Sequence, residues 1–227
     1  MNGVYYKRNL PHYQPGNTDY FVTFRMANSL PKKVIDNLKN EYSILINETG
    51  KINDLSKRKR AILRNGKQYF RKFDNLLDGS QTGPLWLKEE PIANIICESI
   101  IYRDKKQYDL HCFTIMPNHV HVVFRIEDVY VGRIADSTAR NSVSGYRVTK
   151  ILQDLKKFTA IESNKILNRN GQFWQNESYD HVIRNSTEYI NLINYVINNP
   201  VKAGLVDNAE NWKWTYIADP VKEFLAK

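Results

Sequence analysis

Two histidines spaced two residues apart, His119 and His121, have the type and spacing that could bind a metal ion. They belong to the segment HVHVVFRI, whose alternation is typical of a β-strand. Because side chains alternate across a strand, both imidazoles would lie on one face, about 7 Å apart along the strand. Taken alone, such a pair is more often two exposed polar positions, and two histidines do not complete a metal site. A third ligand would have to come from elsewhere in the chain.

The segment TEYINLINYVINNP contains a candidate for that third ligand and a candidate nucleophile. Tyr195 and Asn199 are four residues apart, so they would share one face of a helix. The amide oxygen of Asn199 could bind the ion, and the phenol of Tyr195 would lie beside it. Tyr189 faces another way and is the weaker candidate. The alternative is an ordinary packed tyrosine before a helix stop at Pro200, because a chain with 14 tyrosines offers many chance matches.

Positive charge is concentrated in one segment of the chain. The 227 residues carry a formal net charge of +9, and the stretch from Lys57 to Lys72 is rich in basic residues without a single acid. Its spacing predicts an amphipathic helix, although Gly66 weakens that prediction. The basic face would comprise Lys57, Arg60, Arg64, Lys67 and Arg71, with Ile62, Tyr69, Phe73 and Leu76 opposite. We expect this face to bind nucleic-acid phosphates, and Lys156 and Lys157 are further candidates; for both groups a solvated surface is the alternative.

Composition excludes several classes of protein. With 42% hydrophobic residues the chain is not a disordered polymer. No apolar run approaches the roughly 20 residues that span a bilayer, and the polar N-terminus shows no signal peptide. Two cysteines, Cys97 and Cys112, are too few for a disulfide framework or a cysteine-rich zinc site. These features predict a soluble, cytoplasmic protein.

Local patterns predict an α+β fold in which helices cover an antiparallel sheet. The expected strands are 19–26, 108–116 and 119–126, and the expected helices are 29–46, 57–76, 87–103, 147–167 and 186–198. Ser29 is the expected N-cap of the first helix, and Pro200 is expected to stop the last one. Residues 78–84 are predicted to form a loop and residues 127–146 to be irregular. The aromatic segment containing Phe173, Trp174 and Tyr179 favours the core over base stacking.

Several segments together resemble one known family. MPNHVHVVF (Met116 to Phe124) is similar to the His-hydrophobic-His motif of single-tyrosine transposases of the HUH superfamily. NYVINNPVKAGLV (Asn194 to Val206) resembles the tyrosine-helix motif of the REP-associated tyrosine transposases, an IS200-like group. Further similar segments occur in the expected order: RNLPHY, DYFVTFR, LKKFTA, FWQNESYDHVIR and NWKWT. The joint occurrence is specific, so the resemblance outweighs the ordinary explanation of each motif alone.

This resemblance implies a ferredoxin-like or RRM-like antiparallel sheet, the HUH endonuclease fold. It implies that His119 and His121 bind a divalent ion, that Tyr195 is the nucleophile and that Asn199 lies near the metal. Nitrogen and oxygen donors favour Mg²⁺ or Mn²⁺ over a structural zinc. The expected activity is cleavage and rejoining of single-stranded, hairpin-containing DNA through a 5′-phosphotyrosine intermediate.

The resemblance also implies one transposase domain over residues 1–227. A basic helical insertion is expected at about 50–80, and a short C-terminal extension at about 207–227. The extended tyrosine motif favours a monomer, although some relatives dimerise. His111 and His181 are expected to be structural residues rather than ligands. The competing hypothesis is a non-catalytic nucleic-acid-binding module on the same fold, and a third, another metal hydrolase, lacks the usual carboxylate cluster.

Overall fold

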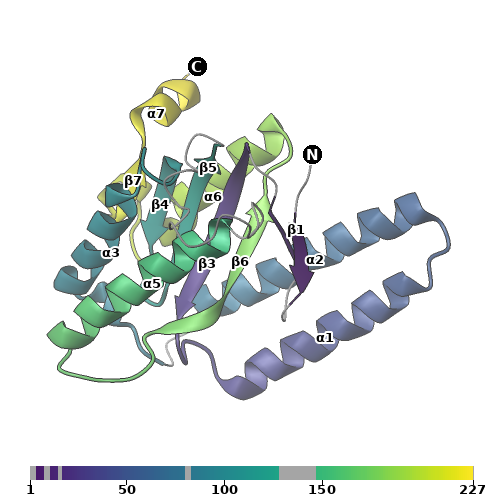
Figure 1. Ribbon diagram of the computed structural model, residues 1–227, viewed down its shortest axis with the longest axis horizontal. Helices are drawn as coiled ribbons and strands as arrows, with labels where there is room; N and C mark the ends of the chain where they lie inside the picture. Colours follow the sequence, from purple (N-terminus) through teal and green to yellow (C-terminus); the bar gives the residue numbers. More distant parts are fainter. Residues whose placement is uncertain (1–3, 8–10, 15–16, 80–82, 128–146, 227) are drawn as a thin grey trace, which may run out of the picture. The chain divides into compact units, whose positions relative to one another are not determined.

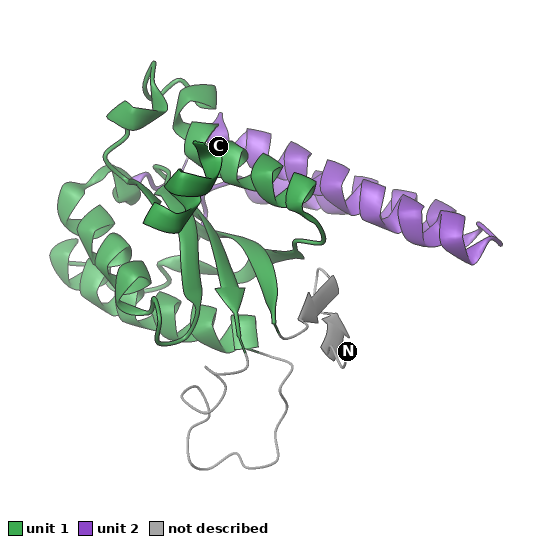
Figure 2. Ribbon diagram, turned by 90° about the horizontal axis from the view of Figure 1, so that it is seen from above, with its two compact units in different colours: residues 1–27, 86–227 green, residues 28–85 purple. Residues whose placement is uncertain are grey.

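The computed structural model describes the chain except for residues 1–3, 8–10, 15–16, 80–82, 128–146 and 227, and the side chains of residues 1–16. The chain divides into two compact units, residues 1–27 with 86–227 and residues 28–85 (Figure 2). Parts of three segments discussed above, RNLPHY, the loop 78–84 and the polar stretch 127–146, therefore lie outside the described residues.

The first unit contains a five-stranded antiparallel sheet with the strand order β6-β3-β5-β4-β7. Its strands are β3 (Thr18–Met26), β4 (Asp109–Ile115), β5 (His119–Ile126), β6 (Trp174–Val182) and β7 (Thr215–Ile217). The three predicted strands are confirmed, as is the α+β fold with an antiparallel sheet. β5 lies at the centre between β3 and β4, so both neighbours can contact its side chains.

Helices cover both faces of this sheet (Figure 1). α3 (Glu90–Tyr102) and α5 (Arg147–Ile166) lie on one face, and α6 (Ser186–Lys202) lies on the other. The core between the sheet and the first two helices includes Val120, Val122 and Phe124 of β5, together with Ile96 and Leu155. Because strand residues alternate, His119 and His121 point to the other face, toward the α6 side.

Two predicted helix boundaries are wrong. α1 begins at Lys32 with Pro31 at its N-cap and no side-chain cap, and Ser29 is buried instead. α6 continues through Pro200 to Lys202. A proline inside a helix removes one backbone hydrogen bond, and here that loss falls in the last turn, where it interrupts little of the helix. The continuation keeps Tyr195, Asn199 and Lys202 on one helix.

The second unit is a pair of antiparallel helices, α1 (Lys32–Gly50) and α2 (Leu55–Asp78). Tyr42 of α1 packs against Tyr69 of α2 with ring centroids 4.7 Å apart. The Asn65 amide donates to Thr49 Oγ1 at 2.9 Å. Helix α2 runs through Gly66 without a break, which confirms the predicted amphipathic helix. Ile62 and Leu76 remain more than a third exposed, because two helices alone cover only a narrow apolar strip.

The basic face of α2 keeps the predicted composition. All five of its side chains are exposed, and we call them the basic stripe: Lys57, Arg60, Arg64, Lys67 and Arg71. The stripe lies opposite the α2 residues that contact α1, by the helical period of about 100° per residue. Its length, from Lys57 to Arg71 at about 1.5 Å per residue, is about 21 Å.

The remaining elements are short. β1 (Val4–Lys7) and β2 (Pro11–Gln14) form a separate two-stranded sheet. The 3-10 turns η1 (Trp86–Lys88) and η3 (Ala209–Asn211) precede α3 and β7, and α7 (Asp219–Leu225) follows β7. The residues expected to form a C-terminal extension therefore supply an edge strand of the sheet. Among the helices that the structure describes, none has the length and apolar character needed to cross a membrane.

Candidate functional site

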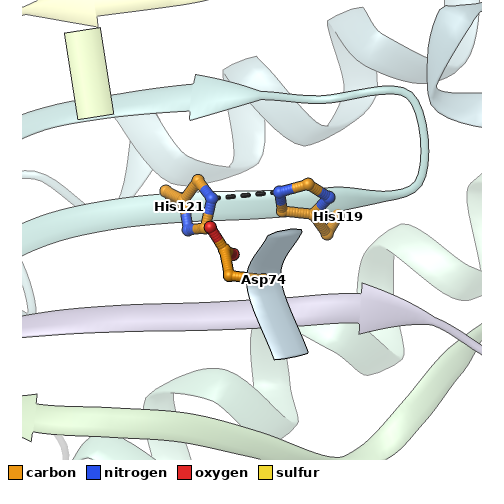
Figure 3. A group of neighbouring side chains, drawn as sticks. All are labelled: Asp74, His119 and His121. Atoms are coloured by element: carbon orange, nitrogen blue, oxygen red, sulfur yellow. Dashed lines mark hydrogen bonds between the residues drawn. The ribbon is translucent and has the colours of Figure 1, made fainter. Parts of the chain in front are cut away.

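The two histidines of β5 meet on the sheet face that α6 covers. Their Nε2 atoms are 3.0 Å apart and their ring centroids 4.6 Å apart, with the rings at 75° (Figure 3). Both side chains are completely buried. The alternative of two exposed polar positions is therefore wrong, since neither imidazole reaches solvent. Asp74, also labelled in Figure 3, belongs to α2 of the second unit.

Each imidazole is held at its other nitrogen by a protein oxygen. His119 Nδ1 lies 2.6 Å from Asn118 Oδ1, and His121 Nδ1 lies 2.7 Å from Thr23 Oγ1. Thr23 reaches His121 because the two residues are direct partners in the β3–β5 register. Such contacts at the distal nitrogen fix ring orientation in metal sites and leave the opposite nitrogen for an ion.

Electrostatics keeps both rings neutral at physiological pH. Burial lowers the pKa of His119 to about 3, and the positive charge of Lys202 adds to this effect. Burial also holds the pKa of His121 well below its ordinary value, with smaller contributions from His119 and Lys202. A neutral imidazole can present a nitrogen lone pair, which is the form that binds metal ions.

Tyr195 lies directly against this pair. Its ring centroid is 5.5 Å from that of His121 and 6.0 Å from that of Phe21, which itself stacks on His121. Lys202 Nζ lies 5.3 Å from the centre of the Tyr195 ring. The structure therefore brings together the predicted histidines and the predicted tyrosine, although 74 positions separate His121 from Tyr195.

Asn199 lies one turn after Tyr195 on α6 and is completely buried. Neither its Oδ1 nor its Nδ2 has a hydrogen-bond partner among the described residues. Leaving a buried amide without a hydrogen-bond partner costs about 1–3 kcal/mol of folding free energy. Such amides are therefore retained mainly where another group supplies the missing partner. An ion, a water molecule or a substrate group could satisfy the Asn199 amide.

These donors fit a divalent cation. Two ligands at right angles on an octahedral ion, each about 2.1 Å from it, are about 3.0 Å apart. That separation matches the 3.0 Å between the two histidine Nε2 atoms. The buried histidine group could thus hold a metal ion, and neutral nitrogen donors accept Mg²⁺ less readily than Mn²⁺.

Tyr189, the other tyrosine of the motif helix, has a different environment. Its hydroxyl lies 3.0 Å from His111 Nδ1, and His111 Nε2 lies 3.1 Å from Asp19 Oδ1. Burial, with the nearby Cys112 and Asp19, raises the pKa of Tyr189, so its phenol stays protonated and donates to His111. His181 is likewise bonded, to Glu188 Oε1 at 3.0 Å. Tyr189 is thus a hydrogen-bonded packing residue. His111 and His181 both have hydrogen-bond partners within the protein, which agrees with the structural role expected for them.

The two candidate lysines of α5 differ in their surroundings. Lys156 Nζ donates to Ser178 Oγ at 2.5 Å and to the Gln175 carbonyl oxygen at 2.9 Å. It also lies 5.8 Å from the ring centre of Phe24, whose side chain points into the α5 core. Lys156 therefore lies on the opposite sheet face from His121. Lys157 is exposed. Phe173 and Trp174 are buried, which confirms their expected core role.

Three residues of the site escape prediction from sequence. Asn118 directly precedes His119, so proximity could have suggested its role. Lys202 is seven residues after Tyr195, a spacing that returns to the same helix face, and this pattern could have revealed it. Thr23 has no local signal, because only the pairing of β3 with β5 brings it to His121.

The first unit thus combines a helix-covered antiparallel sheet with a buried histidine pair beside a helix tyrosine. No known protein-family model matches the chain. A Haemophilus influenzae protein named "Putative REP-associated tyrosine transposase" is 28% identical over 112 residues, 48% of this chain and 58% of that relative. The similarity thus covers less than two thirds of the relative's length.

This relative confirms the predicted resemblance to the REP-associated tyrosine transposases. A solved structure of a REP-associated tyrosine transposase bound to a REP hairpin is also similar to this chain. It has 13% sequence identity and a TM-score of 0.47, with coverage of 92% of this chain and 80% of that one.

Proposed function

We propose that this chain is a metal-dependent tyrosine endonuclease and strand transferase, a transposase acting on single-stranded, hairpin-containing DNA. The observation that carries the proposal is the contact between the rings of Tyr195 and His121, with His119 Nε2 3.0 Å from His121 Nε2. The motif resemblance and the Haemophilus relative support the same class of reaction. The DNA substrate is itself proposed, because the sequence match covers only 58% of the length of that relative.

His119, His121 and Asn199 would hold Mg²⁺ or Mn²⁺ in this mechanism. When bound, the ion would polarise the scissile phosphate and offset the charge that develops during transfer. The histidines supply neutral nitrogen donors, and Asn199 supplies a buried amide oxygen without a protein partner. This donor set contains no thiolate, which argues against a structural zinc site.

The Tyr195 hydroxyl would attack phosphorus in line with the leaving 3′ oxygen. The new bond joins Tyr195 Oη to the 5′ phosphate, the bond from phosphorus to the 3′ oxygen breaks, and the 3′ oxygen leaves as a hydroxyl after taking a proton. A free phenol has a pKa of about 10, so its ionisation needs help. The ammonium of Lys202, 5.3 Å from the ring centre, would favour the phenolate by charge attraction.

DNA phosphates would be bound outside this centre by exposed cations. The basic stripe of α2 and Lys157 of α5 are the candidates, because their side chains are exposed. The Lys156 ammonium is bonded to the β6 segment, so its contribution to DNA binding would require those bonds to be exchanged. In this proposal residues 50–80 are an insertion into a single transposase domain.

The decisive experiment incubates the protein with a labelled DNA hairpin carrying single-stranded flanks, in the presence of Mn²⁺ or Mg²⁺. Wild-type protein should form a covalent protein–DNA adduct, and Tyr195→Phe should abolish it. Tyr189→Phe is the matched control, since it removes the same hydroxyl from the same helix and should retain the adduct. An adduct in Tyr195→Phe that is lost in Tyr189→Phe would reverse the assignment. DNA binding without any adduct in wild type would favour the non-catalytic alternative.

A further inference from the structure

The Nδ1 atoms of the two histidines have partners of different chemical type. Asn118 Oδ1, which lies 2.6 Å from His119 Nδ1, is a carbonyl oxygen and can only accept a hydrogen bond. His119 must therefore carry its hydrogen on Nδ1, and its Nε2 presents a lone pair. Thr23 Oγ1, which lies 2.7 Å from His121 Nδ1, is a hydroxyl that can either donate or accept.

The short contact between the rings then determines the second tautomer. Because His119 Nε2 is an acceptor, the 3.0 Å contact requires a hydrogen on His121 Nε2. His121 Nδ1 is consequently an acceptor, and the Thr23 hydroxyl donates to it. Both rings are completely buried, with Thr23 4% and Asn118 2% exposed, so bulk water offers little replacement for these partners.

An ion bound by both Nε2 atoms needs a different tautomer of His121. The hydrogen on its Nε2 must leave, and the ring stays neutral only if Nδ1 takes up a hydrogen. Thr23 must then accept where it previously donated. Asn118 needs no such change, because His119 already has its hydrogen on Nδ1.

We propose that Thr23 is a positioning residue that lets His121 exchange between a metal-free and an ion-binding tautomer, while Asn118 holds His119 permanently in the ion-binding one. The proposal deepens the function proposed above and rests on its metal site. A rotation of one hydroxyl lets Thr23 bond to His121 Nδ1 in both states. Backbone hydrogen bonds anchor the Asn118–His119 segment: Met26 N donates to Asn118 O at 2.9 Å, and Met116 N donates to His119 O at 2.8 Å.

A matched pair of variants tests the role of the hydroxyl. Thr23 and Thr114 flank His121 from β3 and β4, respectively, in the same register row. Thr114 Oγ1 bonds to Thr215 Oγ1 at 2.9 Å rather than to the imidazole. Thr23→Val and Thr114→Val therefore make the same isosteric change beside the same histidine, and only the first removes its hydrogen-bond partner.

The first readout is the Mn²⁺ affinity of the DNA-free protein, measured by calorimetry or by electron paramagnetic resonance. Thr23→Val should weaken Mn²⁺ binding by about 10–100-fold, the usual effect of losing such a supporting contact. Thr114→Val should bind as wild type does, and Thr23→Ser should restore the affinity. Wild-type affinity in Thr23→Val overturns the proposal, as does an equal loss in both valine variants, which would indicate a packing effect.

The second readout is the histidine tautomer, measured by ¹⁵N NMR of the metal-free protein. His119 should be protonated on Nδ1 and His121 on Nε2, and saturating Mg²⁺ should move the His121 hydrogen to Nδ1. The opposite tautomers in the metal-free protein overturn the proposal. A wild-type chain that binds neither ion overturns both the metal site of the proposed function and the exchange proposed for His121, whereas ion binding that leaves the His121 hydrogen on Nε2 overturns the exchange alone.

Discussion

Removing charge from the basic stripe of α2 should weaken DNA binding and, above all, its dependence on salt. The test variant replaces four residues of the stripe with glutamine: Arg60, Arg64, Lys67 and Arg71. All four side chains are exposed, so their loss should leave the helix pair folded. The stripe is about 21 Å long, and phosphates of one strand repeat every 3.4 Å or so, so every cation has a phosphate within reach.

The magnitude follows from counterion release. Each phosphate neutralised contributes about 0.7 to the salt slope on single-stranded DNA and about 0.9 on a duplex. Four lost contacts should reduce the slope by about 2.8–3.6. Wild type should therefore bind DNA more tightly than the variant at low salt, and this ratio of affinities should shrink by roughly 50–150-fold between about 50 and 200 mM salt.

The assay is fluorescence anisotropy with a labelled hairpin over a salt series. A control variant replaces four exposed lysines of the first unit with glutamine: Lys88, Lys106, Lys165 and Lys213. Both variants lower the formal net charge of +9 by four, so only the location of the lost charge differs. If both change the slope equally, or neither does, the stripe is a solvated surface and the reasoning is refuted. Adduct formation at saturating DNA should be unchanged in the stripe variant.

Three further predictions concern buried or constrained groups. Burial lowers the pKa of Lys156 to about 7, so between about pH 7 and 10.4 the unfolded chain binds more protons than the folded one. The free energy of unfolding, relative to that of Lys156→Met, should therefore rise with pH in this range, by up to about 1.4 kcal/mol per pH unit. Chemical denaturation at several pH values measures it. Asn199→Leu should raise the melting temperature, because it removes an unsatisfied buried amide costing about 1–3 kcal/mol, while abolishing adduct formation. Gly83 has a φ of 90°, and an added Cβ would lie 2.3 Å from the Asn28 carbonyl oxygen. Gly83→Ala should therefore destabilise the fold by more than Gly204→Ala, where φ is 68° and no atom lies within 4 Å.

Each of these predictions has a clear contrary result. A stability difference for Lys156→Met that does not change with pH would mean that the carbonyl and hydroxyl contacts offset the desolvation of its ammonium. Full adduct formation in a stabilised Asn199→Leu protein would remove Asn199 from the site. Equal unfolding free energies for the two glycine variants would show that the Asn28 backbone moves aside at little cost.

Local patterns were sufficient for most elements of the fold. Alternation predicted β3, β4 and β5, and the 3.6-residue period predicted α2 in spite of Gly66, because burial against one neighbour imposes these repeats. The boundaries were less predictable. Ser29 is a favourable N-cap residue and Pro200 a usual stop, but packing decides where a helix ends once its tertiary contacts are formed.

The sequence by itself determined the chemical groups of the candidate site and their local order: two imidazoles on one strand face, and a phenol and an amide on one helix face. Only the tertiary structure decided that Tyr195 contacts His121, that Thr23 bonds its Nδ1 from 98 positions away, and that Lys156 lies on the other face of the sheet. The physical reason is that spacing within an element follows from backbone geometry. Contacts between elements depend instead on strand order and register, which the whole core selects.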